Sequence, residues 1–194
     1  MKIVIATSNN HKIKEYEEMC KGLNISFKSL KDIGFSEEII EDGKTFEENS
    51  LIKAKAILPY TNLPIMADDS GIEIEALGEH FPGVYSHRYS ISNGGQEKTN
   101  EMLIKTCPGS NAKFRCVITL LNITKDPLIF KGEFSGHIAN KIILGNGFGY
   151  DPIFIPNGYS SPVSTLSEID KNKISHRGLA FKKMISYLVD NMLI

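Results

Sequence analysis

Short apolar runs that end abruptly in polar residues constrain the fold of this chain most. Residues 2–6, KIVIA, are mostly apolar and β-branched, and the polar stretch TSNN follows at once. Such a run is typical of a buried strand. Residues 11–22 then place Ile13, Tyr16 and Cys20 at helical spacing before Gly22. The chain is therefore expected to open with a strand, a polar loop and a helix.

Similar patterns predict the remaining elements. Strands are expected over residues 24–30, 64–67, 72–76, 113–121 and 126–139, the last two as an antiparallel pair. Helices are expected over residues 45–58, 94–107 and 175–192. Thr45 and Glu48 stand in capping-box register, and Ser175 is a suitable N-cap. We expect an α/β fold with an elongated mixed sheet, in one domain over residues 1–194 whose two lobes flank a central cleft.

Composition narrows the class of protein. The 194 residues are 41% hydrophobic and 23% charged, as in a globular protein with a real core. A net charge of -1 argues against broad electrostatic binding to nucleic acid or to an anionic membrane. Any phosphate group must then be bound by a few locally placed lysines and arginines.

The cysteines and the N-terminal segment indicate a cytoplasmic protein. Cys20, Cys107 and Cys116 are odd in number and lack C-x-x-C spacing, so we expect reduced thiols rather than disulfides or a zinc site. Cys116 alternates with apolar residues and is expected in the core. The N-terminal apolar run is too short for a signal peptide, and no run approaches ~18 apolar residues.

Four polar clusters are expected at the ends of elements. The first is TSNNHK, residues 7–12, between a strand and a helix. Backbone N–H groups at a helix start, with Lys12 one turn in, could bind an anion. The alternative is a helix cap and a solvated lysine, since the glycines of a P-loop are absent.

The second cluster is Asp68-Asp69-Ser70-Gly71, with EIIEDG at residues 38–43 as a companion. Adjacent carboxylates after a strand can supply a ligand for Mg²⁺ and a base or supporting carboxylate. The alternative is an Asx-type turn.

The third cluster is GNGFGYDPIF, residues 145–154, where glycines surround Phe148 and Tyr150. Aromatic faces in such a loop can stack on a nucleobase, and Asp151 can accept a hydrogen bond from a base or sugar. The alternative is an aromatic–glycine turn that leads a strand into the core.

The fourth cluster is KNKISHRG, residues 171–178, which we expect to crowd Lys171, Lys173, His176 and Arg177 into the first turn of the last helix. Cations are unfavourable at a helix N-terminus, so an anionic or electron-rich ligand is expected there. The alternative is a solvated basic turn. The other histidines lack metal-ligand spacing, and no nucleophile elbow is present.

Together the clusters supply what a nucleoside triphosphate requires, and their motifs resemble the Ham1/RdgB-type inosine triphosphate pyrophosphatases. The resemblance rests on five ordered segments, ATSNNHKIKE, EDGKTFEENSLIKA, ADDSGIEIEALG with PGVYSHRY, GFGYDPIF and KNKISHRGLA. They extend from Ile3 to beyond Ala180, nearly the whole chain.

This resemblance implies a fold, a reaction and a set of site residues. The fold is an elongated mixed α/β structure with a central nucleotide-binding cleft, usually as a homodimer. The reaction is Mg²⁺-dependent hydrolysis of ITP, dITP and XTP to the monophosphate and pyrophosphate. Glu41 and Asp69 would bind the metal, and Asp69 would be the catalytic proton acceptor. Substrate would contact Thr7, Ser8, Asn9, Asn10, His11, Lys12, Ser70, Phe148, Gly149, Tyr150, Asp151, Lys171, His176 and Arg177.

The chemistry of such a site can be anticipated. Lys12 and loop amides would neutralise the outer phosphates. A carboxylate of near-normal pKa is a weak base, so Asp69 is expected to align water rather than deprotonate it, and the role of Asp68 stays open. A 6-oxo purine could accept from Lys171, His176 or Arg177, whereas adenine could not. How GTP is excluded is not evident.

Three departures from the family pattern lie outside the acidic cluster. LGEHFPG is one residue longer than usual, with His87 where alanine is common, and the segment before Lys171 is shorter, with Ser164 in place of a lysine. Two other functions compete with the first: a pyrophosphatase for other modified nucleotides, and a nucleotide-binding module without turnover.

Overall fold

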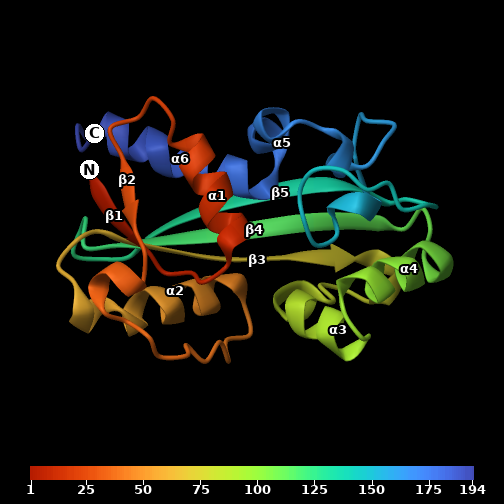
Figure 1. Cartoon of the computed structure of the whole chain (residues 1–194), viewed down its shortest axis with the longest axis horizontal. Coiled ribbons are helices and arrows are strands. Elements are labelled where there is room, and N and C mark those ends of the chain that lie inside the picture. The colour runs from red at the N-terminus through yellow and green to blue at the C-terminus, as the bar shows by residue number, and fades with distance from the viewer. The chain divides into compact units, whose positions relative to one another are not determined.

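The computed structural model describes all 194 residues and is built on one six-stranded sheet (Figure 1). The strand order is β2-β1-β3-β4-β5-β6. β1 (Lys2–Ile5) pairs in parallel with β2 (Ser26–Lys28) and with β3 (Ile65–Ile74). β4 spans Asn111–Leu121, and β5 (Leu128–Ile138) pairs antiparallel with β6 (Phe154–Pro156). The sheet is mixed, and the predicted α/β class is confirmed.

Six α-helices accompany the sheet: α1 (Asn10–Met19), α2 (Phe46–Ala56), α3 (Ser86–Ser92), α4 (Gln96–Thr106), α5 (Glu168–Ile174) and α6 (His176–Asp190). The predicted capping box at the start of α2 is confirmed, because the side chains of Thr45 and Glu48 bond each other's backbone N–H groups. The sequence patterns did not predict α3 and α5 as separate helices. None of the helices combines the length and apolar character needed to cross a membrane.

The chain divides into two compact units. Unit 1 comprises residues 1–69, 116–132 and 177–194, and unit 2 comprises residues 70–115 and 133–176. Strands β3, β4 and β5 each pass from one unit into the other. The two lobes and the cleft expected from the sequence remain predictions.

Both faces of β1 are buried in unit 1, because neighbouring strand residues point to opposite faces. Ile3 and Ile5 belong to a core shared with Tyr16 of α1 and Phe181 of α6. Val4 and Ala6 belong to a second core, which includes Ala54 of α2. Figure 1 shows α1 and α6 on one side of β1 and α2 on the other. Cys116 lies in the first core and is buried, as predicted.

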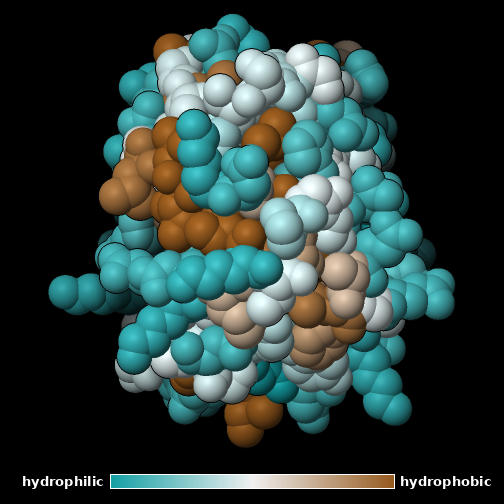
Figure 2. All heavy atoms as spheres, turned by 90° about the vertical axis from the view of Figure 1, so that its right-hand side faces the viewer, coloured by the Kyte–Doolittle hydropathy of each residue, from teal (hydrophilic) through white to brown (hydrophobic).

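Unit 2 has its own core, built from the ends of β3, β4 and β5 together with α4 and β6. Phe114 and Phe154 pack edge to face in it, with ring centroids 4.8 Å apart. Figure 2 looks at the side that lies at the right of Figure 1, where apolar side chains form patches between hydrophilic ones.

Candidate functional site

The acidic pair does not lie at a strand end. β3 runs without interruption from Ile65 to Ile74, so both the expected break after residue 67 and the Asx-type turn are wrong. Asp68 and Asp69 are 1% and 8% exposed. Because adjacent strand residues point to opposite faces, the two carboxylates meet different partners.

Asp68 is the anionic centre of one group of charges in unit 1. Its Oδ2 lies 2.9 Å from the Lys12 ammonium and 3.6 Å from Nε of Arg177. Burial alone would raise the pKa of Asp68. The positive charges of Lys12, Arg177 and Lys53 outweigh burial and lower the pKa to about 2. Its buried Oδ1 has no hydrogen-bond partner. Asp68 is therefore an ionised carboxylate with one acceptor atom still available.

Asp69 faces different groups and has the opposite pKa shift. Its Oδ2 accepts a hydrogen bond from the Asn49 amide at 3.2 Å, and its Oδ1 lies 3.4 Å from the Lys53 ammonium. Burial raises the pKa of Asp69, Lys53 and Lys12 lower it, Glu41 raises it, and the net shift is upward. Asp69 is therefore a stronger base than an ordinary carboxylate, contrary to the near-normal pKa expected from sequence.

Glu41 and Asp69, the two expected metal ligands, share one cationic partner. The Lys53 ammonium lies 2.5 Å from Oε2 of Glu41 and 3.4 Å from Oδ1 of Asp69. The two carboxylates are thus close enough to bind one cation. No group of three or more His, Cys, Asp or Glu side chains is arranged to hold a metal ion. Two carboxylates fit Mg²⁺, which commonly takes one or two from the protein and the rest from water and phosphate.

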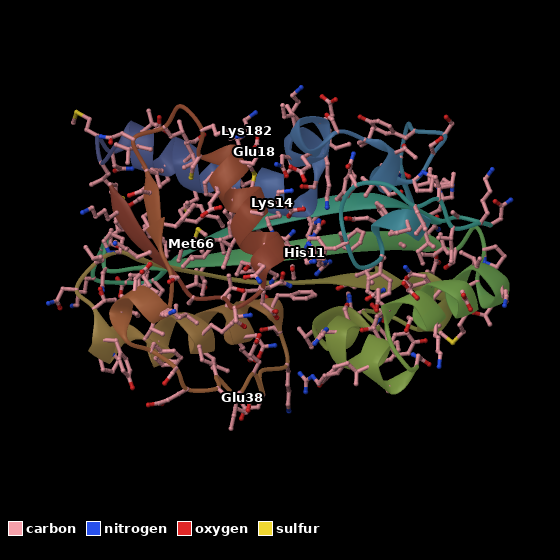
Figure 3. The ribbon with its side chains drawn as sticks, in the orientation of Figure 1. His11, Lys14, Glu18, Glu38, Met66 and Lys182 are labelled. Atoms are coloured by element: carbon pink, nitrogen blue, oxygen red, sulfur yellow. The ribbon has the colours of Figure 1, made fainter.

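The loop at residues 7–12 was expected either to bind an anion or to form a helix cap beside a solvated lysine, and the cap is present. Asn9 caps α1, since its Oδ1 accepts from the backbone N–H groups of His11 and Lys12 at 3.0 and 3.3 Å. These two N–H groups are therefore already engaged. The lysine is not solvated, because Lys12 bonds Asp68. Figure 3 shows His11 at the N-terminal end of α1, with Lys14 and Glu18 further along the helix.

Arg177 belongs to the same group of unit 1 charges. Its Nη1 lies 2.5 Å from Oε2 of Glu15 on α1, and the residue is 2% exposed. Burial lowers the pKa of Arg177, but Glu15 and Asp68 outweigh it and raise the pKa well above its usual value. Arg177 is thus a buried, permanently charged link between α6, α1 and β3.

In unit 2 the glycine–aromatic loop is a compact turn held by Asp151. Oδ2 of Asp151 accepts from the Phe148 backbone N–H at 2.8 Å. Tyr150 is buried and donates its hydroxyl to the Ser86 carbonyl at 2.8 Å. Asn100 donates to the Gly149 carbonyl at 3.0 Å. The core-turn interpretation is therefore correct for Tyr150, whereas Phe148 is partly exposed.

The basic cluster is divided between two helices. Lys171 and Lys173 lie in the last turn of α5, where cations are favourable, so their expected place in the first turn of the last helix is wrong. The reason is the extended backbone of Ser175, with φ -70° and ψ 156°, which separates α5 from α6. Lys171 binds Asp151 at 2.5 Å, with its ammonium 5.1 Å from the Phe148 ring centroid.

His176 and Ser70 also lie in unit 2. The His176 ring stacks on Phe114 with centroids 4.7 Å apart and planes 13° apart, and it is 5% exposed. Ser70 continues β3 directly after Asp69. Unit 2 therefore contains Ser70, Phe148–Asp151, Lys171 and His176, while unit 1 contains residues 7–12, Glu41, Asp69 and Arg177.

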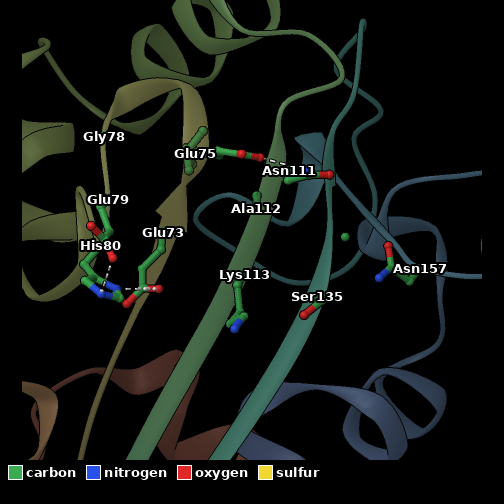
Figure 4. Close-up of a pocket in the computed structure, with 12 residues that line it drawn as sticks. Glu73, Glu75, Gly78, Glu79, His80, Asn111, Ala112, Lys113, Ser135 and Asn157 are labelled. Atoms are coloured by element: carbon green, nitrogen blue, oxygen red, sulfur yellow. Dashed lines mark hydrogen bonds and ion pairs between the residues drawn. The ribbon is translucent and has the colours of Figure 1, made fainter.

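A separate pocket of about 390 Å³ opens in unit 2 (Figure 4). His80 lies against Glu73 and Glu79 on one side of it, and Lys113 lies on β4. None of the predicted site residues lines this pocket.

Three residues that organise the unit 1 charges were not predicted as site residues: Asn49, Lys53 and Glu15. A signal was available for two of them. Phe46, Asn49, Ser50 and Lys53 follow helical core-face spacing and are all buried in α2. A lysine and an asparagine on the buried face of a helix indicate polar partners inside the fold.

The fold and these contacts define an α/β protein with a buried acid pair, in which each acid is paired with a lysine from a different helix. The Ham1 family model matches residues 3–187, and the chain belongs to the Ham1 family. Similar curated proteins include dITP/XTP pyrophosphatases from Bacillus subtilis (strain 168), 39% identical with 95% of this chain and 96% of that protein covered, and from Thermoanaerobacter pseudethanolicus, 38% identical with 99% and 98% covered.

Solved structures agree with this assignment. A HAM1 protein from Coxiella burnetii superposes with a TM-score of 0.85 at 36% identity, over 98% of this chain and 99% of that one. The Staphylococcus aureus Ham1 protein gives 0.83 at 33% identity, over 98% and 100%. The predicted family is confirmed.

Proposed function

We propose that this chain hydrolyses non-standard purine nucleoside triphosphates, dITP, ITP and XTP, to the monophosphate and pyrophosphate in a Mg²⁺-dependent reaction. Membership of the Ham1 family and the relatives named dITP/XTP pyrophosphatases support the activity. The observation that carries the mechanism is the pair of neighbouring buried aspartates in β3, one paired with Lys12 and the other held by Asn49 and Lys53. Two carboxylates whose environments separate their pKa values indicate different catalytic roles.

In this proposal Asp69 accepts the proton of the attacking water. In the metal-free chain burial holds the pKa of Asp69 above that of an ordinary carboxylate, which makes it a better proton acceptor. The Asn49 amide fixes Oδ2 of Asp69 at 3.2 Å and thereby orients the carboxylate. Ser70, the next residue of the strand, is proposed to contact the substrate.

Lys12 supplies positive charge for the triphosphate. Its ammonium is held by ionised Asp68, which is held in turn by Arg177. A preorganised cation stabilises charge that develops on the pyrophosphate leaving group without rearranging at the moment of reaction. The remaining residues of the loop, Thr7 to His11, are proposed to line the phosphate groups.

Glu41 and Asp69 are the proposed ligands of Mg²⁺. Their common contact with one ammonium supports the fit, because both carboxylates already reach a single cation. When bound, Mg²⁺ supplies positive charge at the phosphates and lowers the pKa of water.

Unit 2 is proposed to bind the base. Lys171 is oriented by Asp151 and lies over Phe148, so a buried donor adjoins a partly exposed aromatic ring. A 6-oxo group can accept a hydrogen bond from Lys171 or His176, and stacking adds roughly 1–3 kcal/mol per base. Adenine presents an amino donor at that position, which leaves such cations poorly paired.

The proposed substrates belong to the cytoplasmic nucleotide pool, so we also propose a cytoplasmic location and a role in removing abnormal purines before they enter nucleic acid. A homodimer, as the family resemblance implies, is proposed as well.

The deciding experiment measures pyrophosphate release from ITP, XTP, GTP and ATP, with Mg²⁺ and with EDTA. The expected result is a kcat/KM for ITP and XTP at least about 100-fold above that for ATP, because adenine leaves the polar groups of a site built for a 6-oxo purine unpaired. A pyrimidine preferred over ITP would instead support a pyrophosphatase for other nucleotides. Binding of ITP without pyrophosphate release would support a module without turnover.

A further inference from the structure

Lys53 occupies the point where the two proposed metal ligands converge. One ammonium bonds Glu41 at 2.5 Å and Asp69 at 3.4 Å, and the lysine side chain is only 9% exposed. Lys53 lies in α2, within the segment EDGKTFEENSLIKA, but the sequence patterns assigned it no role.

The chain holds this arrangement from α2. Asn49, one helical turn before Lys53, donates to Oδ2 of Asp69 at 3.2 Å, and its Oδ1 accepts from the Gly43 backbone N–H at 2.9 Å. Asn49 thus ties the segment that carries Glu41 to the same helix. Residues 37–43 have no regular secondary structure, and Ile40 within them is 76% exposed. The position of Glu41 therefore depends on a few side-chain contacts.

Resting on the proposed metal site, we propose that Lys53 is a positioning residue whose ammonium takes the place of the divalent cation between Glu41 and Asp69. It keeps the two carboxylates together while no metal is bound, since two neighbouring carboxylates without a cation between them repel each other. A divalent cation on the same oxygens and the ammonium repel each other, so the ammonium leaves both carboxylates when the metal binds.

This role has a consequence that a purely structural lysine would lack. Removing the ammonium removes a competitor, so metal affinity rises even though the metal-free chain becomes less ordered. A residue that merely stabilises the fold would lower metal affinity when it is replaced.

The test compares three variants by direct metal titration. Lys53→Met keeps the length of the side chain and removes its charge. Lys53→Arg keeps the charge and offers a planar fork that binds carboxylates more firmly. Lys55→Met removes the same charge from an exposed position on the same helix and serves as the control. Isothermal titration with Mn²⁺ alone, without nucleotide, gives the affinity, and hydrogen exchange over residues 37–44 gives the order of the Glu41 segment.

The two Lys53 variants are expected to change the affinity for Mn²⁺ in opposite directions. Lys53→Met binds Mn²⁺ at least about tenfold more tightly than the unchanged chain, a change of about 1.4 kcal/mol. Its residues 37–44 exchange faster without metal and return to the original rate with metal. Lys53→Arg binds Mn²⁺ at least about tenfold more weakly, and Lys55→Met is unchanged. Because Lys53→Arg retains the ion pairs, it keeps the test decisive if Lys53→Met does not fold.

Equal or weaker Mn²⁺ binding by Lys53→Met, or unchanged binding by Lys53→Arg, overturns the proposal. Pyrophosphate release by the unchanged chain is measured in parallel with Mg²⁺ and with EDTA. If that release depends on metal while the Mn²⁺ affinities of the Lys53 variants change in the opposite direction to that expected, only the role of Lys53 is refuted. If the unchanged chain shows no metal-dependent release, the proposed function fails, and absent Mn²⁺ binding then refutes the role of Lys53 as well.

Discussion

The Lys12 ammonium lies 2.9 Å from Oδ2 of Asp68, and Asp68 is 1% exposed. Removing one member of a buried ion pair leaves the other charge buried, which typically costs 3–5 kcal/mol. Asp68→Asn is therefore expected to lower the free energy of unfolding by about 3–5 kcal/mol in urea denaturation.

A matched control exists in the same unit. Glu18 pairs with the exposed Lys21 on the surface, so Glu18→Gln is expected to cost no more than about 1 kcal/mol. Similar losses in the two variants would show that the Lys12–Asp68 contact is not a buried pair in solution.

The contribution of Asp68 should also depend on pH. Its folded-state pKa of about 2 is below the value of about 4 in an unfolded chain. A lowered pKa adds stability that is present above about pH 4 and is lost as pH falls toward 2. The stability difference between the unchanged chain and Asp68→Asn, measured in EDTA from pH 7 to 2.5, is expected to shrink below pH 4. A difference that stays constant over this range would contradict the pKa shift.

The sequence predicted those elements whose formation depends on residues close together in the chain. The capping box of Thr45 and Glu48 and the apolar face of α6 could be recognised because both depend on residues within a few turns. The path of β3 could not be predicted. Asp and Gly disfavour strands and Ser is common in turns, so residues 68–71 looked like a turn. Three cations on helices, Lys12, Lys53 and Arg177, neutralise the two aspartates of β3. These long-range ion pairs override the low strand propensity of the segment.

The roles of the site residues stay predictions, but the contacts of these residues can be compared with the motifs. The motifs pointed to Asp69, Glu41 and Lys12 by residue type and order, but not to their pairing. Lys53 was overlooked because a lysine on a helix is normally solvated, and its burial depends on two acids distant in sequence. Lys171 was assigned to the wrong helix although Ser175 was recognised as a suitable N-cap. An N-cap residue has extended backbone, so the residues before it lie outside the helix that it caps.

Replacing Asp69 tests the proposed base. Asp69→Asn keeps the shape of the side chain and removes its capacity to accept a proton, so kcat is expected to fall by about 10²–10⁴-fold. Binding of ITP, measured by titration, should change little, because the cations around Asp68 remain. Turnover near the original rate would remove Asp69 from the role of base.

Lys171 and Lys173 provide a matched pair on one short helix. The Lys171–Asp151 pair is buried, with side chains 5% and 6% exposed, whereas the Lys173–Asp170 pair is 66% and 57% exposed. Lys171→Met is expected to cost about 3–5 kcal/mol in unfolding free energy and to raise KM for ITP, whereas Lys173→Met costs at most about 1 kcal/mol. Equal stability of the two variants, or an unchanged KM for Lys171→Met, would argue against Lys171 as an organised donor for the base.

The last prediction concerns Gly71, where two of the sequence motifs meet within unit 2. A Cβ atom at this position would overlap the Gly83 carbonyl oxygen and would lie 2.5 Å from Oγ of Ser86. Ser86 cannot easily move away, because its hydroxyl donates to the Gly83 carbonyl and accepts from the Ile72 backbone N–H. The glycine after Asp-Asp-Ser is thus required by close packing rather than by a turn. Gly71→Ala is expected to cost at least about 3 kcal/mol, the upper range for overpacking, because backbone has to shift.

Gly22→Ala separates packing from backbone strain. Gly22 has φ +82°, and a methyl group added there would have no atom within 4 Å, so alanine meets only the cost of a left-handed backbone, about 1–2 kcal/mol. Urea denaturation of both variants should give the larger loss for Gly71→Ala. If Gly71→Ala is as stable as Gly22→Ala, β3 has room beside Gly83, and the tight contact between Gly71 and the Gly83–Ser86 segment does not hold in solution.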